Sequence, residues 1–313
     1  MRLGVEIAGI RFKNPLIAAS GTFGYGVEYE GLLDLSRLGG IVSKGLYLEP
    51  RDGAPTPRII ETPSGLLNAI GLQGVGIHAF VRDVLPRLAR HETALLVNVC
   101  GESVEEYAEV ARVCDGVPGI AGLEVNISCP NVRKGGMAFG ADPRLTHEVV
   151  AAVRRATRLP VVPKLSPNVG DITLFARAAE EAGADALSCV NTLLGLAIDV
   201  DARRPRLGFG TGGLSGPAIR PVAVRMAWQA ARAVRIPVIG VGGISCASDA
   251  LEFLIAGCRA VQIGTASFVD PGIWERLPAE LGAYLERHGL EDVNSVVGTL
   301  EYPGLPRPCE ERR

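Results

Sequence analysis

The sequence is poor in aromatic residues and carries almost no net charge. Aromatic residues make up 5% of the 313 residues, and the formal net charge is -2. Proteins that bind single-stranded nucleic acid use aromatic stacking platforms, and proteins that bind a duplex present a basic surface. We therefore expect no nucleic acid partner.

Long apolar runs are also missing. The chain has no stretch of about 18 apolar residues, so we expect no membrane-spanning helix. Its first 15 residues mix charged with apolar side chains and lack the apolar centre of a signal peptide. Because 47% of the residues are hydrophobic, the chain can still bury a sizeable core. These features predict a soluble, cytoplasmic protein.

The seven cysteines have none of the spacings of a disulfide or metal site. They form no C-x-x-C pair, and their odd number and scattered positions argue against a disulfide framework. They also offer no set of four thiolates for an iron–sulfur cluster. Paired metal-ligand histidines, a Ser-His-Asp order and a Walker phosphate loop are missing too. We expect no metal site in this chain.

What recurs, about eight times, is a strand-like apolar run followed by a segment of helical period. The runs are nearly continuous and rich in Val, Ile and Leu, as in parallel strands covered on both faces. They span residues 15–20, 40–44, 94–99, 122–127, 160–165, 185–190, 236–241 and 260–264. This pattern predicts an α/β protein whose residues 1–313 form a single (β/α)8 TIM-barrel domain. A doubly wound open sheet is the alternative.

Helix signals lie between these runs. Residues 103–114 begin with Ser103 at the N-cap position and Glu106 three residues later, which is a capping-box pattern. Residues 143–157 and 171–183 show apolar positions at a period of 3.6, and the second segment ends at a glycine. All four histidines are expected in helical segments rather than at strand ends, so none is expected to act as a base: His78, His91, His147 and His288.

Three long loops, residues 45–76, 128–144 and 191–217, each follow a strand. In a TIM barrel, the loops after strands form the face that carries active sites. Polar residues gather at the same strand ends: Ser20, Lys44, Asn98, Asn126, Cys129, Lys164, Asn191 and Thr192. Burying one such group without a partner costs on the order of several kcal/mol. Their convergence therefore predicts a binding site.

Glycine-rich turns follow the last two strands. GVGGIS contains Gly242 and Gly243, IGTAS contains Gly264 and Thr265, and Gly216 lies in a third glycine-rich turn. Backbone N–H groups after strands 7 and 8 of a TIM barrel often bind phosphate. Each glycine pair alone is also compatible with a tight turn, but the position favours a phosphorylated cofactor or substrate.

Cys129 differs from the other cysteines. Cys100, Cys189 and Cys258 lie in apolar strand segments and are expected to be inert core residues. Cys129 lies in the loop NISCPNVRKGGMAFG, just beyond the fourth strand and close to basic residues. A free thiol has a pKa of about 8.5 and can act as a base near neutrality when its surroundings favour the thiolate. Spacing alone leaves a reactive and an inert role open.

Several motifs together resemble the dihydroorotate dehydrogenase family. They are SGTFGYG, SKGLYLEPRDGAPTPRIIETPSGLLNAIGLQ, VNISCPNVRKGGMAFG, PVVPKLSPNV and IPVIGVGGI. The resemblance extends from the N-terminal strand to the last helix, and the combination of LNAIGLQ with NISCPN is highly specific. The cysteine in NISCPN is similar to that of the soluble class I enzymes. The NVRKGG and EPR–PTPR stretches resemble the NAD-linked subclass IB more than the fumarate-linked subclass IA.

This resemblance implies oxidation of (S)-dihydroorotate to orotate in pyrimidine synthesis, with one FMN at the C-terminal face of the barrel. It implies that Cys129 is the general base, taking a proton from C5 while hydride leaves C6 for the flavin. FMN contacts are implied for Ser20, Lys44, Gly45, Asn98, Asn126, Lys164, Val190, Gly216, Gly242, Gly243, Gly264 and Thr265, the last four around the phosphate. Substrate contacts are implied for Lys44, Asn68, Ala69, Ile70, Gly71, Leu72, Asn126, Asn191 and Thr192.

The resemblance also implies partners. Subclass IB works with a second subunit that carries FAD and a two-iron, two-sulfur cluster and passes electrons to NAD+. The catalytic subunit of that subclass forms a dimer within a heterotetramer. The scattered cysteines agree with this division, because this chain cannot build the cluster itself.

The sequence departs from the family pattern at two places. Gly74 and Val75 stand where Asn-Pro is expected, and Tyr47 is bulkier than the usual small polar residue. We expect both to alter loop packing rather than the reaction. Three other functions remain open: a reductase of a dihydropyrimidine such as dihydrouracil, a sugar-phosphate isomerase or aldolase barrel without flavin, and a noncatalytic flavin-binding subunit. Lys44 favours a carboxylated substrate over dihydrouracil.

Overall fold

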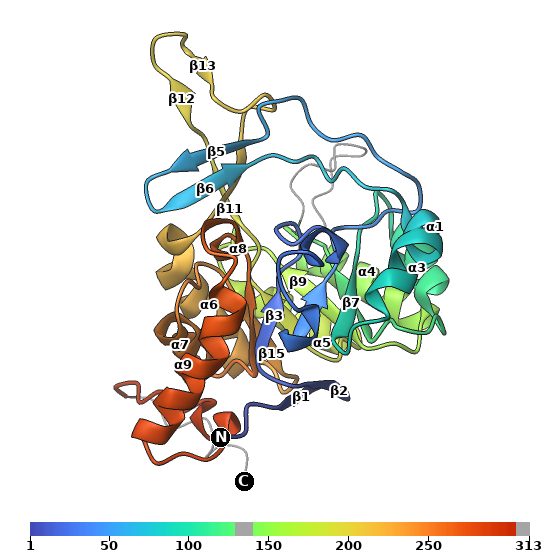
Figure 1. Cartoon of the computed structure of the whole chain (residues 1–313). Helices are drawn as coiled ribbons and strands as arrows, with labels where there is room; N and C mark the ends of the chain where they lie inside the picture. Colours follow the sequence, from blue (N-terminus) through green and yellow to red (C-terminus); the bar gives the residue numbers. More distant parts are fainter. Residues whose placement is uncertain (129–139, 305–313) are drawn as a thin grey trace.

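A closed barrel of eight parallel strands forms the centre of the protein, whose computed structural model describes residues 1–128 and 140–304 (Figure 1). The barrel strands are β3 (Leu16–Ala18), β4 (Gly40–Val42), β7 (Ala94–Val99), β8 (Gly122–Val125), β9 (Val161–Leu165), β10 (Leu187–Cys189), β15 (Val238–Val241) and β16 (Ala260–Ile263). Their order in space follows the chain, and β16 pairs with β3 with Val261 opposite Leu16. Closure leaves the barrel without an edge. The predicted TIM barrel is confirmed, each predicted run contains one barrel strand, and the open-sheet alternative is wrong.

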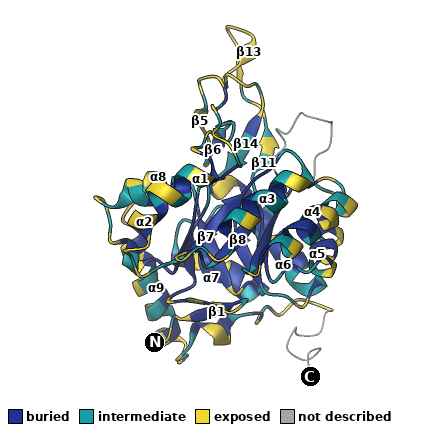
Figure 2. Cartoon of the chain, turned by 90° about the vertical axis from the view of Figure 1, so that its right-hand side faces the viewer, coloured by how far each residue is buried: buried dark blue, intermediate teal, exposed yellow. Residues whose placement is uncertain are grey.

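Helices cover the outside of the barrel, so the strands are buried on both faces (Figure 2). The longer helices are α3 (Val104–Cys114), α4 (Pro143–Ala156), α5 (Ile172–Glu181), α6 (Arg220–Ala233), α7 (Ala247–Ala256) and α9 (Ile273–Arg287). Shorter helical segments are η1 (Val27–Tyr29), η2 (Leu35–Arg37), α1 (Ile77–Ala79), η3 (Phe80–Val84), α2 (Leu85–Leu88), η4 (Pro217–Ile219), α8 (Ala266–Val269) and η5 (Val293–Val296). Among the described residues, no helix is both long enough and apolar enough to span a membrane.

The predicted helix ends agree with the structure in most details. Ser103 caps α3, and its hydroxyl accepts from the Glu106 N–H at 3.2 Å. The Glu106 carboxylate accepts from the N–H of Glu102, at 2.7 Å, rather than from that of Ser103, so the capping box is shifted by one residue. Helix α5 gives way to Gly183, whose φ of +93° stops the helix as predicted. The expectation for the histidines is wrong for His91, which lies in the turn before β7 and contacts Glu30.

Two of the long loops fold into a small antiparallel sheet beyond the C-terminal ends of the barrel strands (Figure 1). Its strands, in spatial order, are β11 (Leu193–Gly195), β14 (Gly212–Ser215), β6 (Gly65–Asn68) and β5 (Ile59–Thr62). A second hairpin, β12 (Ile198–Asp199) with β13 (Arg204–Pro205), extends outward from it. In the sequence these segments resemble loops, because strands of two to four residues show too little alternation to be recognised. The opposite end of the barrel carries the hairpin of β1 (Val5–Ile7) and β2 (Ile10–Phe12).

The N-cap of α3 gives a testable prediction of stability. Ser103→Ala should lower the free energy of unfolding by about 1 kcal/mol, because the Glu106 N–H loses its partner. Ser103→Asp is the matched control and should keep the wild-type stability, since aspartate is an equally good N-cap. Denaturant unfolding measures both. Equal stability of the alanine variant and the wild type would contradict the assigned cap.

Candidate active site

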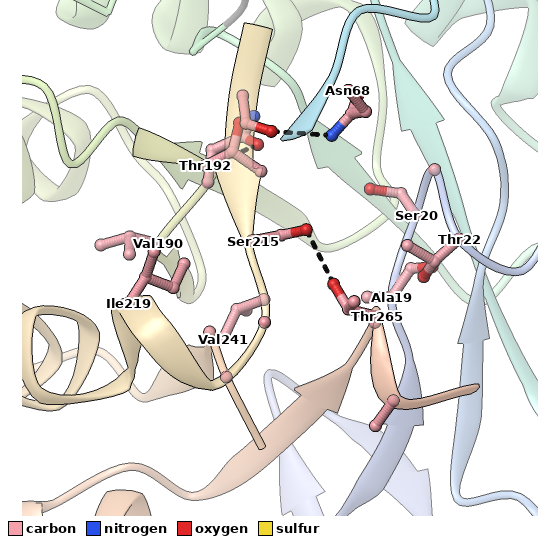
Figure 3. A pocket seen from close by; sticks show the side chains of 18 of the residues that line it. Ala19, Ser20, Thr22, Asn68, Val190, Thr192, Ser215, Ile219, Val241 and Thr265 are labelled. Atoms are coloured by element: carbon pink, nitrogen blue, oxygen red, sulfur yellow. Dashed lines mark hydrogen bonds between the residues drawn. The ribbon is translucent and has the colours of Figure 1, made fainter. Parts of the chain in front are cut away.

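A cavity lies where the barrel strands end, beneath the antiparallel sheet (Figure 3). Its volume is about 340 Å³, within the range of small-molecule sites. Each of the eight barrel strands places a residue in its lining, either within the strand or one or two positions after its end: Ser20, Lys44, Asn98, Asn126, Lys164, Val190, Val241 and Gly264. The cavity therefore exists because closure of the barrel brings eight distant strand ends together.

The residues predicted to contact a cofactor or substrate all line this one cavity, from Ser20 just after the first barrel strand to Thr265 after the last. The structure shows that these residues lie around one cavity. The role of each residue stays a prediction. Cys129 lies outside the described residues. None of the histidines lines this cavity.

A buried carboxylate that the sequence analysis missed lies behind the cavity wall. Glu124 is fully buried in β8, and its Oε1 accepts from Asn98 Nδ2 at 2.7 Å and from Ser20 Oγ at 3.1 Å. Its Oε2 accepts from Gln262 Nε2 at 2.5 Å. Glu124 and Gln262 stand inside apolar runs, and a polar residue at the centre of such a run was the signal that could have identified them.

Lys164 is the cation beside that carboxylate. Its side chain is 5% exposed, and its ammonium nitrogen lies 3.5 Å from Glu124 Oε1. The same nitrogen donates to Gln262 Oε1 at 3.2 Å and to Ser20 Oγ at 3.4 Å. A buried ammonium group is tolerated only when a counter-charge and hydrogen-bond acceptors offset its lost hydration. Glu124, Gln262 and Ser20 together supply both, and they hold Lys164 at the cavity.

Asparagine and serine side chains continue the hydrogen bonding along the cavity wall. Asn126 Nδ2 donates to Asn98 Oδ1 at 3.4 Å, and Ser128 Oγ donates to Asn126 Oδ1 at 3.1 Å. Asn191 Nδ2 donates to Ser128 Oγ at 2.6 Å, and Asn191 Oδ1 accepts from the backbone N–H of Thr192 at 2.8 Å. These bonds tie the ends of β7, β8 and β10 into one row of amides.

Lys44 is a second and more accessible cation in the cavity. Burial lowers the pKa of its ammonium group, Glu28 opposes that shift, and the nearby Arg58 adds to it. Its nitrogen lies 6.0 Å from the centroid of the Tyr25 ring, a distance compatible with a weak cation–π contact. Lys44 therefore places a positive charge at the end of β4, where an anionic ligand would meet it.

The glycine turns after β15 and β16 form a narrow backbone pocket. Gly243 has a φ of +76°, and a Cβ there would stand 2.8 Å from the carbonyl oxygen of Gly216. Within the described part of the chain, the backbone N–H groups of Gly242, Gly243, Gly264 and Thr265 donate to no protein group. The Thr265 hydroxyl donates to Ser215 Oγ at 2.8 Å (Figure 3). Free N–H groups in such a turn are suited to binding an anion.

The two departures from the family pattern are accommodated by local contacts. Val75 donates its backbone N–H to the Tyr25 hydroxyl at 3.1 Å. Tyr47 is buried, with the guanidinium of Arg51 4.2 Å from its ring centroid. Arg51 in turn pairs with Glu102 at 2.6 Å.

Comparison with known proteins gives a consistent result. The family described as "Dihydroorotate dehydrogenase" matches residues 2–285. The "Dihydroorotate dehydrogenase B (NAD(+)), catalytic subunit" of Citrifermentans bemidjiense is 56% identical over 299 residues, which cover 96% of this chain and 98% of that protein. The Desulforudis audaxviator protein of the same description is 56% identical over 304 residues, which cover 97% of this chain and 99% of that protein. The one from Geobacter sulfurreducens is 56% identical over 299 residues, with coverages of 96% and 98%.

The backbone pocket gives a second prediction. Gly243→Ala should lower the free energy of unfolding by about 1–3 kcal/mol, because the new Cβ forces a strained φ and meets the Gly216 carbonyl. Gly264→Ala is the matched control, since a Cβ there meets its nearest neighbour, Thr22, at an ordinary 3.4 Å. Thermal and denaturant unfolding of both variants test this. A Gly243 variant as stable as the Gly264 variant would contradict the described turn.

Proposed function

The chain belongs to the dihydroorotate dehydrogenase family, and we propose that it is the catalytic subunit of the NAD-linked enzyme, oxidising (S)-dihydroorotate to orotate in pyrimidine synthesis. The observation that carries this proposal is the convergence of Lys44, Lys164 and a row of asparagine amides on one cavity at the C-terminal end of the barrel. Dihydroorotate has a carboxylate and a ring of amide groups. An ammonium group complements the former, and asparagine can both donate to and accept from the latter.

We propose FMN as the resident cofactor, and the residues present fit it. The free backbone N–H groups of the turns after β15 and β16 suit the phosphate, and Gly243 leaves room for its close approach. Asn98, Asn126 and Lys164 offer amide and ammonium donors to a polar ring system. FMN would supply the hydride acceptor, a function that no amino-acid side chain provides.

The protein's own residues would then have separate tasks. Lys44, at the end of β4, would hold the substrate carboxylate. Lys164, fixed by Glu124, would offset negative charge that develops on the cofactor. Asn68, Asn191 and Thr192 would align the substrate ring, together with the backbone of residues 69–72.

We propose Cys129 as the general base that takes the proton from substrate C5. It lies outside the described residues, but Ser128, just before it, is bonded to Asn126 and Asn191 of the cavity lining, which supports the assignment. A positioned base contributes roughly a factor of 10² to 10⁴ in rate.

We also propose that a partner subunit with FAD and a two-iron, two-sulfur cluster passes the electrons to NAD+. The relatives' designation as catalytic subunits supports a second subunit. We further propose that the catalytic subunit forms a homodimer within a heterotetramer.

Anaerobic mixing of purified protein with dihydroorotate tests substrate, cofactor and base together. The flavin absorbance should bleach, and Cys129→Ala should slow the bleaching by about a hundredfold or more because the proton acceptor is lost. Cys100→Ala, which removes a different cysteine, is the control. Bleaching by dihydrouracil but not by dihydroorotate would favour the alternative reductase. A colourless protein that takes up no FMN would contradict a flavoenzyme, and unchanged bleaching in Cys129→Ala would remove Cys129 as the base.

The lowered pKa of Lys44 predicts how product binding depends on pH. The ammonium is charged below its pKa and neutral above it, and burial brings that change below the usual lysine value of about 10.4. As the pH rises toward the usual lysine pKa, orotate affinity should therefore fall earlier and more steeply in the wild type than in Lys44→Met. Titrating orotate against the flavin absorbance measures both; orotate's own ionisation affects the two proteins alike. Parallel pH profiles would contradict a carboxylate-binding role for Lys44.

A further inference from the structure

The buried carboxylate of Glu124, just behind the wall of the site, is a charged group that takes no direct part in the proposed reaction. We propose that Glu124 is a positioning residue: it fixes Lys164 and sets the direction of the hydrogen-bond chain that presents the cavity asparagines to the ligand. This inference rests on the proposed function, because orotate and FMN are the ligands on which those groups would act.

Among the described residues, every polar partner of the Glu124 carboxylate can donate a hydrogen bond. Asn98 Nδ2 and Ser20 Oγ donate to Oε1, at 2.7 and 3.1 Å, and the Lys164 ammonium lies 3.5 Å from the same oxygen. Gln262 Nε2 donates to Oε2 at 2.5 Å. An ionised carboxylate has only acceptor sites, so it satisfies all four groups at once. The position therefore requires an acceptor at both oxygens.

Because the Glu124 carboxylate can only accept hydrogen bonds, it determines how the side-chain amide of Asn98 is oriented. Because Asn98 must turn Nδ2 toward the carboxylate, its Oδ1 faces away, where it accepts from Asn126 Nδ2 at 3.4 Å. Asn126 in turn presents its Oδ1 to the Ser128 hydroxyl, at 3.1 Å. The acceptor-only carboxylate thus determines the orientation of two amides that line the cavity.

The other end of the chain is anchored by a group that can only donate. The backbone N–H of Thr192 donates to Asn191 Oδ1 at 2.8 Å, so Asn191 turns its Nδ2 toward Ser128, at 2.6 Å. Ser128 accepts that bond and donates its own proton to Asn126. With an acceptor-only group at one end and a donor-only group at the other, no amide between them can turn over without losing a bond.

The fixed direction has a consequence for the ligand. Asn126 and Asn191 each use one N–H of the amide inside the chain, and within residues 1–128 and 140–304 the second N–H of each donates to no protein group. Spare donors in the cavity wall suit a ligand rich in acceptors, such as one with a carboxylate and ring carbonyls. Glu124, which does not itself line the cavity, would therefore influence which ligand the cavity accepts.

Glutamine cannot replace Glu124 without a conflict. Its amide nitrogen would face either Asn98 Nδ2 or Gln262 Nε2, and both of those are donors. If Gln262 turned over to relieve the second clash, its own nitrogen would face the Lys164 ammonium, which now donates to Gln262 Oε1. One of the groups that hold the cavity must therefore reorient.

The double variant Glu124→Gln with Gln262→Glu should remove this conflict. The amide nitrogen of residue 124 would donate to the new carboxylate at 262, and its oxygen would still accept from Asn98. The carboxylate at 262 would keep a counter-charge beside Lys164. Ser188, whose hydroxyl now accepts from Gln262 at 3.1 Å, can rotate to donate instead. The exchange preserves the charge, the composition and the direction of the chain.

The experiment measures orotate dissociation constants by flavin absorbance, with FMN-loaded wild type, Glu124→Gln, the exchange variant, Glu124→Asp and Glu286→Gln. Glu286→Gln, an exposed substitution on α9, is the control and should match the wild type. Glu124→Gln should weaken orotate binding roughly 10-fold to 100-fold, as expected when one buried group loses its partner. The exchange variant should recover most of this loss. Glu124→Asp, which keeps two acceptor oxygens, should bind orotate more tightly than Glu124→Gln.

Each outcome decides the inference. It is overturned if Glu124→Gln binds orotate as the wild type does, or if its loss of affinity is not recovered by the exchange variant. If Glu124→Gln does not fold, the exchange variant and Glu124→Asp must fold and bind orotate; their failure to do so would reduce Glu124 to a structural residue. A wild type that binds no FMN or no orotate would instead contradict the proposed function.

Discussion

A charge buried in a closed barrel has to be neutralised inside the barrel, and the Glu124–Lys164 pair meets that requirement here. The two side chains come from neighbouring strands, β8 and β9, with 3.5 Å between Lys164 Nζ and Glu124 Oε1. Removing either partner alone would leave an uncompensated charge, which in buried pairs costs about 3–5 kcal/mol. Because the cost of desolvating both charges offsets their attraction, the intact pair adds little net stability, but it strongly constrains the geometry. Gln262, on β16 on the opposite side of the barrel, forms hydrogen bonds with both Lys164 and Glu124. These bonds connect the pair to the opposite side of the barrel.

Barrel closure explains why the polar residues are tolerated at all. A polar group at the end of one isolated strand would meet either water or apolar neighbours. In the closed barrel, the ends of eight strands face one cavity, so amides and hydroxyls from distant segments can satisfy one another. The antiparallel sheet covers this end of the barrel. Within the sheet, the side-chain amide of Asn68 donates to the Gly213 carbonyl at 3.1 Å (Figure 3). The same architecture thus supplies the stability of the fold and the polarity of the site.

The sequence predicted the barrel and the strand-end part of the cavity lining, because both depend on local patterns, whereas residues 68–72 were expected only from the family resemblance. Continuous apolar runs identify buried parallel strands, and polar residues at their ends identify the active face, as for Lys44 and Asn126. The four-stranded sheet was not predicted, since its strands are only three or four residues long and their pairing joins segments far apart. Glu124 and Gln262 were missed for a similar reason. Each is a single polar residue in an apolar strand, and its hydrogen-bond partner lies 138 residues away in the sequence.

The two lysines of the cavity show how one residue type serves two requirements. A cation that stays beside a resident cofactor has to be held in place, and Lys164 has a carboxylate and two further acceptors within 3.5 Å. A cation that binds and releases an anionic substrate cannot keep such a partner, because a fixed carboxylate would compete with the ligand. Within the described residues, Lys44 forms no ion pair. Burial is the main factor that disfavours the charged form of its side chain and lowers its pKa. Substrate binding would remove that unfavourable term by supplying the missing negative charge. In the proposed function, the difference in partners rather than the difference in position would therefore separate the cofactor lysine from the substrate lysine.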